Sequence, residues 1–510
     1  ISALSTTQVR ALAASQIGAL SAADVAEFTT AQVGALTSTQ VQALTSTNMG
    51  DLAETQIAAF TATQLQSISS TNLAALGDTQ IAALTATQIA GLSTTHVRGL
   101  TATNVGALTE TQVAAFTATQ IQALSVTNAA AFAQTQVAAL TATQVRALTS
   151  TQIAAFDATD VAELSTTQIT ALSTTQVRSL SATNIGDLAD TQIAALSAGQ
   201  VQALASTQFA ALDATQIGAL TTTQVAALSV TQVRSLNSTL VSALSDTQIG
   251  ALAASQIAAL STTNLGALDA TQIGSLTVTQ AAALTTTQLS GLSVTNLSAL
   301  DATQIAALSA TQARALTTTQ LAALDSTDIA ELTTTQLSAL STAQVQALTS
   351  TNLADLAGTQ IAAFATTQVQ ALSATKIAAF SDAQIAALTT TQVGALSTAQ
   401  AAGLTATNVA ALTTTQIGAL TATQVARLST TAFNALDATQ VGALTETQVR
   451  ALTATQVGGL TATDVSELST TQIAALTTTQ VRSLSATNIA DLGDTQIAAL
   501  ATTQIRALTA

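Results

Sequence analysis

An eight-residue repeat runs through the whole chain and limits what it can fold into. With Ile1 as position 1, the register continues without an insertion or deletion, giving 63 complete octads and a six-residue remainder. Position 1 is usually Ile, Val or Leu, and position 4 is Leu or Phe except at Ile68. Position 5 is mostly Ser, Thr, Asp or Asn, and position 8 is mostly Gln. Such regularity indicates a stacked array of one small unit.

Local signals favour short helices over one long helix or strands. Eight residues at about 100° each overshoot two helical turns by roughly 80°, so one long helix would have no apolar stripe. In a strand, positions 1 and 4 would lie on opposite faces. The recurring Leu-Thr-Ala-Thr-Gln-Ile instead combines a capping box (Thr and Gln) with a hydrophobic staple (Leu and Ile). We therefore predict an all-α solenoid with one helix of about seven residues per octad. The alternative is a β-solenoid, because Thr, Val and Ile favour strands.

The charged residues support helices independently. Fourteen of the 26 acidic residues lie at positions 5 and 6, where the helix would begin, and nine of the ten arginines lie at position 2, near its end. This order complements the helix dipole, and a strand gives no reason for it. No Pro-rich or Gly/Ser-rich stretch interrupts the pattern, so residues 1–510 are predicted to form a single continuous array without a linker.

Eight acidic residues at position 3 break this order, because they would lie near helix C-termini. They form four pairs, the members of each pair three octads apart, in which a D-x-x-E element precedes an N-x-x-D element. If a solenoid turn takes three octads, the two elements of a pair stack and offer three carboxylates and one amide, which would suit Ca²⁺. The elements are Asp24–Glu27 with Asn48–Asp51, Asp160–Glu163 with Asn184–Asp187, Asp328–Glu331 with Asn352–Asp355, and Asp464–Glu467 with Asn488–Asp491.

Two other interpretations of these sixteen residues stay open. The first and third pairs are separated by the same 38 octads as the second and fourth, so one duplicated block accounts for the repetition. The elements would then be contacts between neighbouring chains, or solvated surface variation. Apart from this Ca²⁺ hypothesis, the sequence predicts no cofactor.

Composition excludes several function classes. The chain has one His and no Cys, and no Ser stands beside a base that could activate it, so we expect no enzyme activity. A formal net charge of −15 disfavours nucleic acid as a partner. Every octad carries polar residues, so no apolar run reaches the roughly 18–20 residues of a membrane span.

A uniform array without predicted loops suits a structural role. Repeat arrays normally need polar terminal caps, so we expect capping domains outside these residues or chains that stack end to end. The chain is accordingly expected to be a segment of a longer protein or a mature chain, with itself as partner. The predicted function is a filament, fibre, sheath or stalk. The alternative is a repetitive ligand-binding array, either a Ca²⁺-loaded scaffold or a Thr array that binds ice or another surface.

The segment Ala411–Leu428, with the sequence ALTTTQIGALTATQVARL, resembles the Ala/Thr/Gln-rich tandem tracts of very long bacterial surface and secreted proteins. The resemblance extends over the whole chain. It implies an extracellular or cell-surface location in a bacterium and an adhesin-like or filament-forming role. It assigns no functional residue.

Overall fold

The computed structural model describes residues 1–508, and within them it contains 63 α-helices and no strand. Each helix begins at position 6 of its octad, from α1 (Thr6–Ala11) and α2 (Ala14–Gly18) to α63 (Thr502–Leu508). Most helices end at position 2 or 3, and α63 ends at position 4. Six four-residue helices end at position 1, namely α16 (Val126–Ala129), α19 (Ser150–Ile153), α26 (Ser206–Phe209), α32 (Ala254–Ile257), α37 (Val294–Leu297) and α54 (Thr430–Phe433). The predicted all-α fold with one short helix per octad is confirmed.

The predicted capping box starts most helices, except those whose N-cap is Ala or Gly or whose position 8 cannot return the bond. At α11 (Ala86–Ala90), the N-cap Thr85 has an extended backbone, and its side-chain oxygen accepts a hydrogen bond from the Gln88 amide at 3.3 Å. In return, the Thr85 amide donates to Gln88 Oε1 at 2.6 Å. These two bonds satisfy amide groups that a helix N-terminus otherwise leaves without partners.

The helices are shorter than expected, because position 4 leaves the helical conformation. Leu100, for example, follows α12 (Thr94–Gly99) with φ −59° and ψ 147°, and its amide still donates to the Val97 carbonyl at 3.3 Å. This extended residue turns the chain toward the next N-cap. No residue among 1–508 has a positive φ, so the turn needs no glycine.

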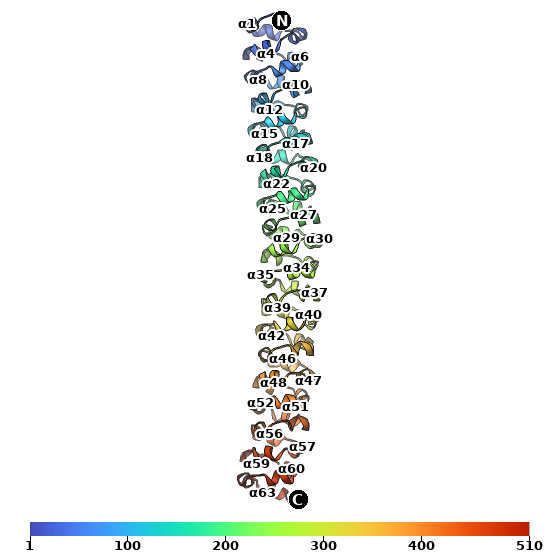
Figure 1. The fold of residues 1–510 in the computed structure, drawn as a ribbon, viewed down its shortest axis with the longest axis vertical. Coiled ribbons are helices and arrows are strands. Elements are labelled where there is room, and N and C mark those ends of the chain that lie inside the picture. The colour runs from blue at the N-terminus through green and yellow to red at the C-terminus, as the bar shows by residue number, and fades with distance from the viewer. Residues whose placement is uncertain (509–510) are drawn as a thin grey trace. The chain divides into compact units, whose positions relative to one another are not determined.

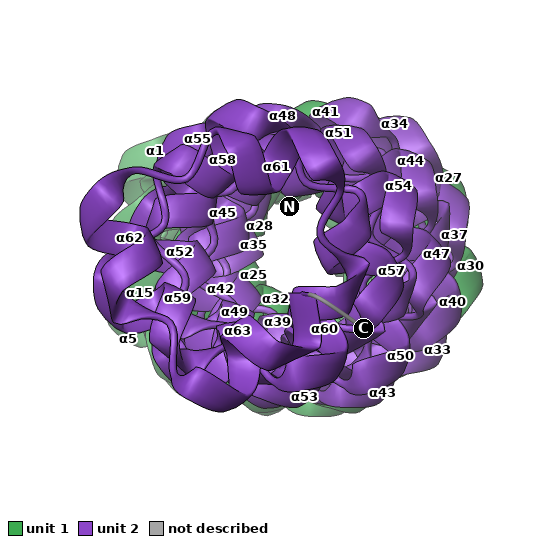
Figure 2. Cartoon of the chain, turned by 90° about the horizontal axis from the view of Figure 1, so that it is seen from below, with its two compact units in different colours: residues 1–260 green, residues 261–510 purple. Residues whose placement is uncertain are grey.

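The helices group into two compact units, Ile1–Leu260 and Ser261–Ala510 (Figure 2). In each unit, helices pack on the helix three octads further along the chain, as α2 does on α5 (Ser38–Ala43) and α39 (Ala310–Ala315) does on α42 (Thr334–Ala339). The helices of each unit thus wind around its axis in chain order (Figure 1). The octad register continues across the boundary between the units, so the prediction of one array over residues 1–510 rests on the sequence.

Positions 1 and 4 form the core of each unit. Ile121 is fully buried and Leu124 is 4% exposed, and the same holds in the other octads except near the two ends, where for example Ile497 and Ile505 of the last octads are 45% exposed. Phe209 and Phe433 are the largest fully buried side chains. Helices this short cannot bury an apolar face alone, so the stacking of turns supplies the core. Within residues 1–508, no helix has the length and apolar character that crossing a membrane requires.

Candidate functional site

The glutamine at position 8 joins successive turns of each unit. Gln120 in α15 (Ala118–Ala123) accepts a hydrogen bond from the N-cap amide of its own helix, and its Nε2 donates to two carbonyls of the preceding turn. These are the carbonyls of Ile89, at 2.8 Å, and of Leu92, at 2.7 Å. The bonds reach back 31 and 28 residues, so one turn takes between three and four octads. Gln120 is 2% exposed, and its amide supplies a donor to the Leu92 carbonyl, whereas the Ile89 carbonyl also accepts from the Leu92 amide at 3.1 Å.

Asparagine at position 8 makes a shorter version of this link. Asn128 Nδ2 donates to the Leu100 carbonyl, 28 residues back, at 2.6 Å. Its side chain is one methylene shorter than that of Gln, and the second carbonyl that Gln reaches receives no bond from it. The position-8 residue therefore sets the number of hydrogen bonds that connect one turn with the next.

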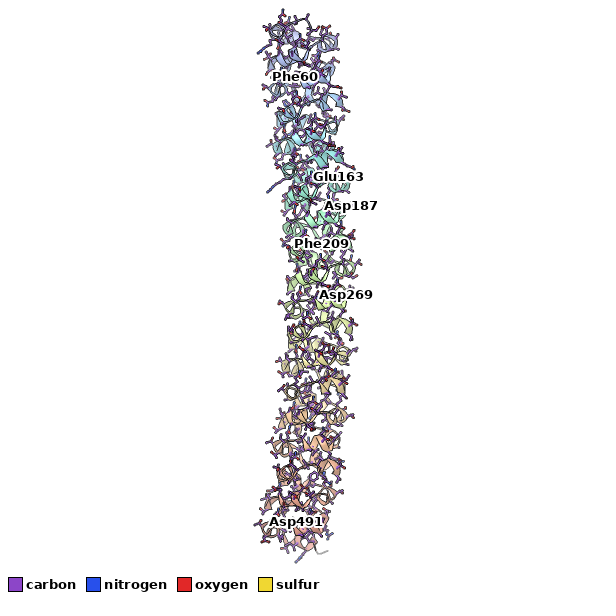
Figure 3. The ribbon with its side chains drawn as sticks, in the orientation of Figure 1. Phe60, Glu163, Asp187, Phe209, Asp269 and Asp491 are labelled. Carbon is purple, nitrogen blue, oxygen red and sulfur yellow. The ribbon has the colours of Figure 1, made fainter. Side chains whose placement is uncertain are left out.

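The structure stacks the helices that carry each predicted acidic pair. The stacked partners are α3 (Ala22–Ala26) with α6 (Ser46–Asp51), α20 (Ala158–Ala162) with α23 (Ala182–Gly186), α41 (Ser326–Ala330) with α44 (Ser350–Ala354), and α58 (Ala462–Ser466) with α61 (Ala486–Ala490). Figure 3 labels Glu163 and Asp187 of the second pair. The spacing of three octads thus brings the two elements of every pair onto adjacent turns.

The asparagines of these elements are engaged with the backbone. Asn184 Oδ1 accepts from the Ser181 amide at 3.0 Å, and its Nδ2 donates to the Phe156 carbonyl at 3.2 Å. Asn48, Asn352 and Asn488 make the equivalent bonds. In residues 1–508, no group of three or more Asp, Glu, His or Cys side chains is arranged so that it could hold a metal ion. The stacking is therefore present, three carboxylates do not converge, and Ca²⁺ binding stays a prediction.

The four aspartates at position 8 accept the capping bond but cannot make the link to the preceding turn. Asp160 is 8% exposed, and its Oδ2 accepts from the Asp157 amide at 3.1 Å. It has no amide to donate to the Phe132 carbonyl of the preceding turn, which accepts no hydrogen bond from the described residues. Burial raises the pKa of the Asp160 carboxyl; the hydrogen bond from the Asp157 amide opposes this rise, and the charge of Asp157 makes a smaller contribution to it. Burial and Asp325 raise the pKa of Asp328 in the same way.

The environments of the other acids in these elements differ. Asp24, near the beginning of the first unit, is partly exposed, and hydrogen bonds from Ser21 lower its pKa. Glu27 pairs with the terminal ammonium group of Ile1 at 2.7 Å. Asp51 and Asp355, the second acids of the first and third pairs, each bury an Oδ2 atom that has no hydrogen-bond partner. A buried acceptor without a donor costs free energy. A cation that contacts these two oxygens would remove this cost, so binding there would be most favourable.

Shallow hollows recur on the surface where Gly at position 2 is followed by Glu at position 6 of the same octad. Three of them hold Gly50 with Glu54, Gly106 with Glu110, and Gly442 with Glu446, and their volumes are about 610, 390 and 490 Å³. Every Glu at position 6 in the chain belongs to this set. A fourth hollow, of about 410 Å³, includes Asp491 of the last acidic pair.

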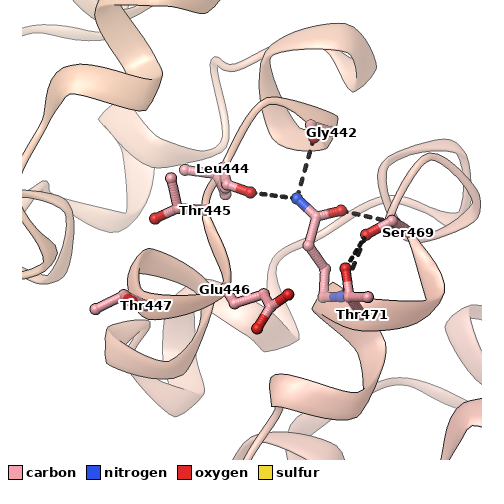
Figure 4. A pocket seen from close by; sticks show the side chains of 8 residues that line it. Gly442, Leu444, Thr445, Glu446, Thr447, Ser469 and Thr471 are labelled. Carbon is pink, nitrogen blue, oxygen red and sulfur yellow. Dashed lines mark hydrogen bonds between the residues drawn. The ribbon is translucent and has the colours of Figure 1, made fainter.

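The hollow at Glu446 is shown in Figure 4. Its lining comes from α56 (Glu446–Ala451), from α59 (Thr470–Ala475), from the residues just before each of these helices, and from Gly442 at the end of α55 (Ala438–Gly442). Gln472 forms its floor by donating to the Gly442 carbonyl at 3.0 Å and to the Leu444 carbonyl, while Ser469 and Thr471 are joined through their hydroxyl groups at 3.0 Å. The Glu446 side chain is exposed and points toward the helix that carries Thr471.

Sequence reasoning missed the second role of Gln and the Gly–Glu hollows. A capping box accepts Glu or Gln at its third helical residue, yet position 8 never contains Glu in this chain. That preference for an amide signals that the NH₂ group is needed. The constant pairing of position-6 Glu with Gly at position 2 was the signal for the hollows.

Comparison with known families supports the tandem-repeat character of the chain. The ALTTAQ repeat matches residues 193–230, 321–357, 361–398 and 473–510. A comparison with curated proteins gives no match. The chain is therefore a repetitive protein with ALTTAQ-type repeats in four segments.

Proposed function

We propose that this protein is a structural component of an extracellular filament, fibre, sheath or adhesin stalk on a bacterial surface, and that it associates with further copies of itself. The observation that carries the proposal is the link between turns. The same Gln hydrogen bonds recur at 28 and 31 residues through both units, so most octads are tied to the preceding turn. Such an array supplies stiffness and a periodic surface without needing a pocket.

The composition supports a role outside the cell. The chain has one Lys, ten Arg, and no Tyr or Trp, and each Phe lies at a core position, so proteases that recognise these residues find few exposed sites. The charge of −15 disfavours binding to nucleic acid. No catalytic role is proposed, because no nucleophile with an adjacent base could be nominated from the sequence.

Electron microscopy of the purified chain, with gold-labelled antibody on intact producing cells, tests this proposal. Uniform fibres in vitro and surface labelling of unpermeabilised cells are the expected results. Monomers at every concentration would refute the self-association, and labelling only after permeabilisation would refute the location. Isolated rods on labelled cells would favour the stalk over the filament.

As a second role we propose a Ca²⁺-loaded scaffold, which the partnerless buried oxygens of Asp51 and Asp355 favour. Calorimetry of the chain in Ca²⁺ and in chelator tests it, with Asp51→Asn/Asp355→Asn as the variant and Asp78→Asn/Asp382→Asn as the charge-matched control. The expected result is a higher melting temperature in Ca²⁺ for the wild type and the control only. Equal melting temperatures of the wild type in the two buffers would rule out the role.

A further inference from the structure

The hollow at Glu446 has a complementary charge on the same helix. Glu446 and Arg450 stand at positions i and i+4 of α56 and so lie on one helix face. They line a second hollow of about 220 Å³ together with Thr471, Ala474 and Ala475. Both charged side chains are exposed, and neither makes an ion pair with residues 1–508. An acid and a base that are adjacent, exposed and unpaired make this surface self-complementary.

We propose that this surface binds a second copy of the chain across a two-fold axis, with Arg450 of each copy entering the Glu446 hollow of the other. The proposal deepens the proposed function and rests on its self-association, for which it names one contact. A two-fold axis requires that if residue i contacts residue j, then j contacts i. Glu446 and Arg450 meet this requirement because both lie on the one surface.

The size and chemistry of the hollow fit a guanidinium group. A volume of about 490 Å³ accommodates the planar head of an arginine and part of its stem. The Glu446 carboxylate can accept two parallel N–H bonds, which is the geometry that arginine provides. Thr447 and Thr471 place further hydroxyl groups at the rim. Gly442 lines the hollow without a side chain.

The chain leaves its arginines available for such a contact. Nine of them make no ion pair or hydrogen bond through their side chains within residues 1–508, namely Arg10, Arg98, Arg146, Arg178, Arg234, Arg314, Arg427, Arg450 and Arg482. Only Arg450 shares a helix with a hollow glutamate. At the corresponding position, Glu54 and Glu110 are followed by Ala58 and Ala114. These two hollows are therefore internal controls, because they have the same acid without the reciprocal base.

Charge-swap variants of the full chain, studied by sedimentation velocity, test the contact. We expect Glu446→Arg and Arg450→Glu each to weaken self-association at least about tenfold, since each reversal places like charges together twice across the axis. The double variant Glu446→Arg/Arg450→Glu restores the pairing and should associate within about twofold of the wild type. Glu110→Arg and Arg482→Glu make the same charge changes elsewhere and should leave association unchanged.

A steric variant tests the hollow without a change of charge. Gln occurs at position 2 elsewhere, where Gln66 and Gln370 donate to carbonyls 25 residues ahead, at 3.0 and 2.7 Å. Gly442→Gln should fold in the same way and place a side chain at the edge of the hollow, where it hinders entry of the partner's arginine, so it should weaken association without a change of charge. Wild-type association that survives Glu446→Arg, Arg450→Glu and Gly442→Gln would overturn the contact and leave the proposed function standing. A wild type that stays monomeric would overturn both.

Discussion

Asp160 tests the interpretation that the position-8 side chain ties one turn to the next. The substitution Asp160→Asn keeps the acceptor for the Asp157 amide and adds a donor directed at the Phe132 carbonyl. Asn184 makes this bond to the Phe156 carbonyl at 3.2 Å, and Asn128 makes it to the Leu100 carbonyl at 2.6 Å. We therefore expect the variant to be more stable than the natural protein.

The magnitude follows from two contributions. One added hydrogen bond contributes about 0.5–1.5 kcal/mol net. Removing the charge from a carboxyl that is 8% exposed, and whose pKa burial raises, adds to this. The sum is about 1–2 kcal/mol, which corresponds to a factor of roughly 5–30 in the local opening equilibrium. Asp160→Gln should exceed it, because Gln reaches a second carbonyl of the preceding turn, as Gln120 does.

Hydrogen exchange measured by mass spectrometry is the suitable assay, because a long repeat array does not unfold in a single two-state step. The amides of Val161, Glu163 and Leu164 in and after α20 should exchange roughly 5–30 times more slowly in Asp160→Asn. Asp213→Asn is the control: Asp213 is an N-cap, and Gln216 of its helix already donates to the preceding turn. In Asp213→Asn, the free energy of local opening obtained from hydrogen exchange should change by less than about 0.5 kcal/mol. Unchanged or faster exchange in Asp160→Asn would refute the reasoning.

Three further predictions use the same chain. Leu240 occupies position 8 without an amide, so Leu240→Gln should form two new hydrogen bonds and raise the free energy of local opening by about 1–3 kcal/mol. Hydrogen-exchange rates equal to those of the wild type would contradict this. Gly18→Ala should lower the melting temperature because its Cβ would lie 2.7 Å from a carbonyl oxygen of the next turn, whereas Gly50→Ala meets nothing within 4 Å and should gain about 0.5–1 kcal/mol of helix stability. The raised pKa of Asp328 means that its contribution to stability is full below the ordinary value of 3.8 and is lost as pH rises through the raised value. Exchange protection of α41 in Asp328→Asn, relative to the wild type and corrected for intrinsic rates, should therefore grow from pH 3 to pH 7, and a constant difference would refute this.

Much of the local structure followed from the octad alone. Thr85 and Gln88 form the predicted capping box, which repeats in register at most helices, and every helix begins at position 6. The burial of Ile121 and Leu124 followed from their apolar character at positions 1 and 4. Helix length was predicted less well: the expected helices have about seven residues, but position 4 is extended and ends them earlier. This extended conformation depends on the direction that the chain takes toward the next N-cap.

The candidate sites were less predictable because they depend on which octads become neighbours. The spacing of three octads indicated that α20 would stack on α23, but the sequence could not show that Asn184 would turn to the Phe156 carbonyl and away from the acids. The hollow at Glu446 likewise combines α56 with α59, which begins three octads further along the chain. Its shape depends on Gln472 reaching the carbonyls of Gly442 and Leu444.

The sequence by itself determined where each helix starts, which side chains are apolar enough for the core, and the order of charges along each helix. These properties depend on interactions within one octad and its immediate neighbours, so the repeat specifies them 63 times over. Only the tertiary structure decided how many octads make a turn and which carbonyls each glutamine binds. The physical reason lies in the two roles of the amide at position 8. Its oxygen accepts the capping bond within its own octad, which the sequence shows. Its NH₂ group donates to a carbonyl of the preceding turn, and that carbonyl comes within reach only when the turn has formed.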